Sequence, residues 1–112
     1  MSTTPASAYF AASYAEAREK FLASCQREKL IVRSYPHARA SGPAGEPLFT
    51  DVARAGPADA ARVLVMISGT HGVEGFCGSA CQVGLLAERA LDPLPRAELR
   101  RPRGARARQP AL

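Results

Sequence analysis

Residues 63–76 read VLVMISGTHGVEGF, an apolar run followed directly by a glycine-rich loop. The run 63–67 is apolar at every position, a pattern typical of a strand buried on both faces of a parallel or mixed sheet. The loop 68–75 holds three glycines, one of the chain's two histidines and a glutamate three residues after it. The residues that follow predict a helix over 76–88 whose small side chains allow close packing on the sheet. This order of strand, loop and helix indicates an α/β fold.

The residues before this unit predict a first helix. Ser13 and Glu16 form an S-x-x-E capping box, which satisfies the amides at a helix start. Apolar residues, Tyr14 and Phe21 among them, recur behind the box at three- and four-residue steps. We therefore expect a helix over about 13–28, with Tyr14 and Phe21 in the core.

Two short strands are expected next. Residues 30–35 (LIVRSY) favour a strand that ends at Pro36, because proline cannot donate a ladder hydrogen bond. A loop over 37–47, a strand over 48–53 and a turn over 56–60 follow from the glycine and proline pattern. The expected fold class is α/β, a partial mixed sheet with flanking helices.

The net charge of +5 is confined to one end of the chain. Residues 1–88 carry eight basic and eight acidic residues, whereas 89–112 carry seven arginines and two acidic residues, 7 − 2 = +5. The segment 89–112 has four prolines and no aromatic or β-branched residue, so a disordered tail is expected. An arginine-rich arm for phosphates is one interpretation. We favour the interpretation that 89–112 is a non-native end, of the kind that translation of a GC-rich gene in a shifted reading frame would produce.

Three further features bound the class of protein. No apolar run is long enough to cross a bilayer, and the first residues lack the pattern of a signal peptide. Three cysteines without framework spacing fit reduced thiols. We therefore expect a cytoplasmic protein with no membrane partner. Its domains are a disordered N-terminus (1–8), a folded part (9–88) and the tail (89–112).

His71 and Glu74 are the candidate metal ligands. Imidazole and carboxylate both bind zinc, and a three-residue separation across a tight turn can direct both to one point. Ligand sites in α/β sheets collect at the carboxyl ends of strands, where this loop lies. A catalytic zinc takes three protein ligands, so a third must come from elsewhere.

Three other interpretations of the loop stay open at this point. The glycines at 69, 72 and 75 resemble a phosphate-binding turn but depart from G-x-G-x-x-G. His71 and Glu74 can also be a structural histidine and a carboxylate placed at a helix start. Finally, Cys77 and Cys81 lie one helical turn apart and can join His71 in a thiolate site, although buried, inert cysteines are the preferred reading.

The longer stretch VLVMISGTHGVEGFCGSACQ resembles the first metal-binding segment of the zinc-carboxypeptidase superfamily. It looks closest to a bacterial carboxypeptidase-like branch once described as a domain of unknown function, and SYAEAREKFLA fits that branch as well. The resemblance covers about residues 10–88. It implies that His71 and Glu74 ligate zinc, which activates water for hydrolysis of a peptide or related amide, with a small peptide or amide as substrate.

The chain departs from that family in its remaining site residues. No histidine follows His71, and the other histidine, His37, lies upstream. The chain has no asparagine, so the family's Asn-Arg element is missing, and no glutamate takes the place of its catalytic base. We assign no catalytic residue. The expected protein is the N-terminal fragment of a zinc hydrolase, inactive or nearly so by itself.

The alternative function is a non-enzymatic module whose arginine-rich tail binds nucleic acid or an acidic partner, although nucleic acid is not the partner we expect. A third hypothesis is a small nucleotide-binding protein that uses the glycine loop. Substrate identity and oligomeric state do not follow from the sequence.

Overall fold

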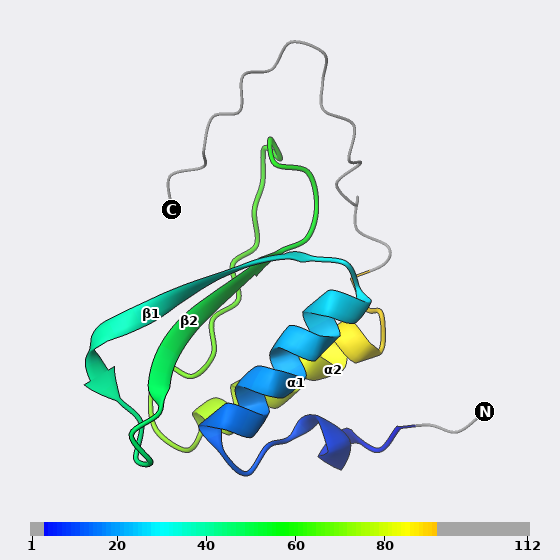
Figure 1. Ribbon diagram of the computed structural model, residues 1–112. Helices are drawn as coiled ribbons and strands as arrows, with labels where there is room; N and C mark the ends of the chain where they lie inside the picture. The colour runs from blue at the N-terminus through cyan, green and yellow to red at the C-terminus, as the bar shows by residue number, and fades with distance from the viewer. Residues whose placement is uncertain (1–3, 92–112) are drawn as a thin grey trace.

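A computed structural model describes residues 4–91, and Figure 1 shows how their elements are arranged. The confirmed α/β class consists of a hairpin and two helices. The predictions for residues 1–3 and 92–112, which include most of the expected tail, concern residues outside the described part of the chain. Within the described part, no helix has the length and apolar character needed to span a bilayer. The elements in chain order are η1 (Ala6–Tyr9), α1 (Tyr14–Arg27), β1 (Ile31–Ser41), β2 (Pro47–Arg54) and α2 (Gly75–Ala87).

Helix α1 confirms the helix predicted over 13–28. The Ser13 hydroxyl accepts a hydrogen bond from the Glu16 amide at 3.2 Å. The Glu16 carboxylate accepts from the Ala12 amide at 3.0 Å, one residue before the amide that a regular capping box uses. At the other end, Lys29 adopts φ 55°, and the Leu30 amide donates back to the Cys25 carbonyl at 2.9 Å. This arrangement is a Schellman motif in which Lys29 occupies the C′ position, where glycine is usual.

Strands β1 and β2 form an antiparallel two-stranded sheet, and β1 continues through Pro36 to Ser41. The prediction that the strand ends at Pro36 is therefore wrong, as is a loop beginning at residue 37. Pro36 lies opposite Phe49, whose N–H and C=O both bond to the Tyr14 hydroxyl of α1, at 2.7 and 3.3 Å. Because Phe49 directs its backbone groups to α1 and not to β1, proline opposite it removes no ladder hydrogen bond.

The buried strand expected at 63–67 is not formed, which corrects the sequence analysis. These residues belong to the long coil between β2 and α2 (Figure 1), and their exposed fractions run from 47% to 80%. Within residues 4–91 the sheet contains only β1 and β2, so it is antiparallel and not mixed. A buried strand requires a neighbour on an edge and cover on its faces, and the described part of the chain supplies neither.

The core lies between the two helices. The most buried side chains are few and come from both: Cys25, Ser24, Ala80, Val83 and Leu86. Tyr14 and Phe21, expected in the core, are only half-buried. Residues 6–8, expected to be disordered, form η1 with Tyr9, whose ring lies so close to Gly84 of α2 that an added Cβ would be 3.0 Å from it. Helix α2 confirms the helix predicted over 76–88, and the glycine-rich loop leads directly into its N-terminal end.

Candidate metal site

The glycine-rich loop turns back on itself before α2 begins. Gly69 has φ +74°, a left-handed conformation that side chains with a Cβ rarely adopt. A Cβ placed on Gly75 would lie 2.9 Å from the Gly69 Cα, so the two backbones touch where the loop closes. The glycines at these two positions are therefore required by the turn.

Gln82 fastens the start of the loop to α2. Its amide nitrogen donates to the Met66 carbonyl at 3.1 Å, and its amide oxygen accepts from the Ser68 hydroxyl at 3.0 Å. Gly78, one turn earlier on α2, lies so close to Ser68 that a Cβ there would be 2.9 Å from the Ser68 Cβ. Gln82 could not be predicted from the sequence, because no motif marks a glutamine that helix packing brings to the loop.

The amides at the start of α2 are already hydrogen-bonded within the chain. Those of Gly75, Phe76 and Cys77 donate to the carbonyls three residues earlier, at 2.9, 3.2 and 3.1 Å. A phosphate-binding turn offers free amides to the anion. Since these three are occupied, the geometry does not favour the nucleotide-binding hypothesis.

His71 and Glu74, in contrast, are exposed and unengaged. Neither side chain has a hydrogen bond or ion pair within residues 4–91. Glu74 is the N-cap of α2, yet its carboxylate caps no amide. A structural histidine is normally held by hydrogen-bond partners, whereas the helix dipole favours a carboxylate at a helix start without any hydrogen bond. The described contacts therefore give His71 no structural role, whereas Glu74 does lie at the start of α2, as the helix-start interpretation requires.

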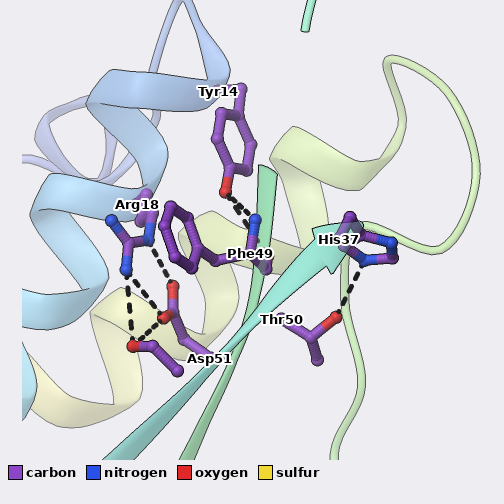
Figure 2. Close-up of polar contacts among 7 residues, drawn as sticks. Tyr14, Arg18, His37, Phe49, Thr50 and Asp51 are labelled. Atoms are coloured by element: carbon purple, nitrogen blue, oxygen red, sulfur yellow. Dashed lines mark hydrogen bonds and ion pairs between the residues drawn. The ribbon is translucent and has the colours of Figure 1, made fainter. Parts of the chain in front are cut away.

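The other candidate ligands lie elsewhere. His37 is on β1, and its Nε2 lies 3.2 Å from the Thr50 hydroxyl of β2 (Figure 2). Cys77 and Cys81 are exposed on α2, which corrects the expectation that they are buried. Cys25 of α1 is fully buried, and this burial raises the pKa of its thiol to about 11. A thiol with that pKa is a poor source of thiolate at neutral pH.

In the part of the chain that the structure describes, no group of three histidine, cysteine, aspartate or glutamate residues lies close enough together to hold a metal ion. The thiolate site of His71 with Cys77 and Cys81 is therefore not assembled. The donors of the loop, a histidine and a carboxylate, suit zinc in kind but supply two ligands instead of three.

Figure 2 shows a second polar cluster, which the sequence did not predict, between α1 and the hairpin. Asp51 accepts hydrogen bonds from Arg18 and from the Ser34 hydroxyl, and Arg18 lies 4.0 Å above the centre of the Phe49 ring. Its charged groups are paired with one another, so the cluster joins α1 to the hairpin and leaves no group ready for a ligand.

Comparison with known proteins places the chain in one family. A search of curated proteins returned no match, and neither did a search of solved structures. The sequence profile of a family described as "Protein of unknown function (DUF2817)" matches residues 10–99. The match includes the loop, both helices and the hairpin, and it continues over residues 89–99, which the sequence analysis assigned to the tail. Because it covers most of the 112 residues, the chain belongs to the DUF2817 family.

Proposed function

We propose that this chain contributes His71 and Glu74 to the zinc site of a carboxypeptidase-like hydrolase that cleaves a peptide or related amide bond. The observation that carries the proposal is the pair itself. Two side chains of zinc-binding type lie on a loop braced by Gln82 and by the Gly69–Gly75 contact, and neither is engaged within residues 4–91. The resemblance of VLVMISGTHGVEGF to the first metal-binding segment of zinc carboxypeptidases supports the same assignment.

Each residue would act through one donor atom. His71 would offer a ring nitrogen of its neutral imidazole, and Glu74 a carboxylate oxygen. A bound zinc supplies a water of lowered pKa and polarises the carbonyl of the substrate. The brace at Met66 and Ser68 fixes where the loop leaves the 63–67 segment, which limits the positions that the two donors can take.

The small number of candidate metal ligands limits what the chain can do by itself. No histidine follows His71, and no third ligand gathers beside the pair within residues 4–91. A two-ligand site binds zinc more weakly than the three-ligand sites of zinc enzymes. We therefore propose that the isolated chain binds zinc weakly and has little or no hydrolytic activity.

Zinc titration of the purified chain tests the assignment. Competition with a chromophoric chelator is measured for the wild type and for His71→Ala, Glu74→Gln and His37→Ala. We expect weak binding that is lost in the first two variants and kept in His37→Ala, whose imidazole lies on the hairpin. An equal loss of zinc binding in His37→Ala, or unchanged zinc binding in His71→Ala, would contradict the assignment of His71 and Glu74 as ligands.

An amide-hydrolysis assay with added zinc tests the second part of the proposal. The expected result is turnover no higher than that of the Glu74→Gln control. Stoichiometric zinc together with turnover that depends on His71 would show that the chain is a complete enzyme.

A further inference from the structure

Cys77 and Cys81 are two thiols that the proposed zinc site does not use. Both belong to α2, both are exposed, and neither forms a disulfide. The third cysteine of the chain, Cys25, is buried in α1. Within residues 4–91, neither exposed thiol has a hydrogen bond to another group. Helix α2 therefore carries two unengaged thiols at its surface.

The helix sets the separation of the two thiols. Residues four apart lie one above the other on the same face of an α-helix, with their Cβ atoms about 5–6 Å apart. A disulfide holds its Cβ atoms about 3.5–4.5 Å apart, so closing one between Cys77 and Cys81 would require α2 to distort. Two metal–sulfur bonds of about 2.3 Å each span sulfur atoms up to about 4.6 Å apart, which rotation of the two side chains allows. The spacing suits an ion held between two thiolates better than a disulfide.

Only small residues lie between the two cysteines. They are Gly78, Ser79 and Ala80, and Ala80 is itself buried. None of these side chains is large enough to keep the two sulfur atoms apart. The face of α2 between the thiols is therefore open to an ion.

The charges near the thiols in the sequence favour a cation as the ligand. Residues 68–88 contain Glu74 and Glu88 and no lysine or arginine. Cysteines that react as nucleophiles lie beside cations, which stabilise the thiolate. Because this part of the chain supplies no such cation, a bound metal ion is the charge that can stabilise two thiolates on α2.

We infer that Cys77 and Cys81 together bind one soft, monovalent metal ion, of which Cu(I) is the representative. Thiolate ligands select soft ions. Zinc also accepts thiolates, but a zinc site takes at least three protein ligands, and no group of three candidate donors lies together within residues 4–91. Cu(I) has a filled d shell and is satisfied by two thiolates in a nearly linear arrangement. Binding converts both thiols to thiolates, so two protons are released and the unit of ion and thiolates carries a single negative charge.

This site is separate from the pair proposed for zinc. His71 and Glu74 offer a nitrogen and an oxygen donor, which suit zinc, whereas two thiols suit Cu(I). Each assignment can therefore fail without the other.

Competition with a chromophoric Cu(I) chelator, without oxygen and with a reductant that contains no thiol, is the primary measurement. We expect the wild type to bind one Cu(I) per chain. Cys77→Ser and Cys81→Ser should each weaken binding by about a hundredfold or more, since loss of an outer-shell partner alone costs about 10–100-fold. Cys25→Ala should keep the wild-type affinity, because that thiol is buried in α1.

A spacing variant tests the geometry. Cys81→Ser combined with Ser79→Cys keeps the number of thiols but places them two residues apart, where side chains on a helix do not face each other. We expect its Cu(I) affinity to equal that of Cys81→Ser alone. Circular dichroism checks that each variant keeps its helices, and native mass spectrometry shows whether the ion is held by one chain or by two.

Zinc and Cu(I) measurements on the same variants keep the two proposals apart. His71→Ala should retain Cu(I) binding, and the double variant Cys77→Ser with Cys81→Ser should retain the zinc binding of the wild type. The inference is overturned if the wild type binds Cu(I) no more tightly than Cys81→Ser, or if the spacing variant matches the wild type. An ion held only between two chains, or loss of Cu(I) binding in His71→Ala, would also contradict a site made by these two thiols alone.

Discussion

The Arg18 guanidinium binds the Asp51 carboxylate through two hydrogen bonds, Nε to Oδ2 at 2.8 Å and Nη2 to Oδ1 at 3.1 Å. The Asp51 side chain is only 8% exposed, and the bond raises the pKa of Arg18. This pair connects α1 to β2, and Tyr14 makes the adjacent connection to Phe49. These polar contacts thus join the hairpin to α1.

Replacing Arg18 with lysine should therefore loosen the hairpin. Lysine keeps the charge but cannot make two parallel bonds to one carboxylate, so we expect Arg18→Lys to lower the free energy of unfolding by about 1–2 kcal/mol. Urea denaturation measures the change. The control is Arg33→Lys, an exposed arginine on β1 that should change stability by less than about 0.5 kcal/mol. Equal effects of the two changes would show that the pair adds nothing specific.

The buried thiol of Cys25 predicts a loss of stability at alkaline pH. Burial raises its pKa from 9.0 to about 11, so between these values the unfolded chain releases a proton that the folded chain retains. The unfolded state then binds fewer protons, and stability falls as the pH rises from about 9 to about 11. The two-unit shift corresponds to at most about 2–3 kcal/mol.

Denaturation curves recorded between pH 8 and pH 11 would reveal this slope as a pH-dependent free energy of unfolding. Cys25→Ala is the control. It lowers stability at every pH through the lost packing, but it should lack this part of the slope. An identical pH dependence in the two proteins would contradict the assignment to Cys25.

The loop glycines should differ sharply in their tolerance of alanine. A Cβ at Gly75 would lie 2.9 Å from the Gly69 Cα, which is backbone, whereas at Gly72 it would meet only the Glu74 carboxylate oxygen at 3.4 Å. We expect Gly75→Ala to cost about 1–3 kcal/mol of unfolding free energy by overpacking, and Gly72→Ala to cost little. Thermal denaturation distinguishes them, and a Gly75→Ala protein as stable as Gly72→Ala would disprove the close approach.

Glycine at the left-handed position that follows each helix should stabilise the protein. Lys29 and Arg89 each have φ 55°, and in both cases the following amide donates back into the helix. Because this conformation costs a residue with a Cβ about 1–2 kcal/mol, we expect Lys29→Gly to stabilise the protein, by less than that cost since glycine also frees the unfolded chain. Gln26→Gly, inside the last turn of α1, should instead destabilise it by about 1 kcal/mol. If both changes destabilise equally, Lys29 is not held in the left-handed region.

The residues of the candidate site are a prediction from the sequence, whereas their surroundings emerged only from the structure. His71, Glu74 and the glycines could be identified because the loop is a continuous stretch whose residue types and spacing indicate its chemistry. The brace by Gln82 could not, because Gln82 lies 14 residues beyond Ser68 and reaches it only once α2 has packed. The state of Cys77 and Cys81 was misjudged for a related reason: a four-residue spacing shows that two residues share a helix face, but not which face is covered.

By itself, the sequence determined the two helices, the presence of two strands between them and the loop between 63–67 and α2, since capping residues, periodicity and glycines act over a few neighbouring positions. Only the tertiary structure decided that β1 passes through Pro36, because Tyr14 of another element takes the backbone bonds of Phe49. It also decided that 63–67 is exposed. An apolar run indicates that burial is favourable, but a strand is buried only where another segment lies beside it, and that depends on the whole assembly.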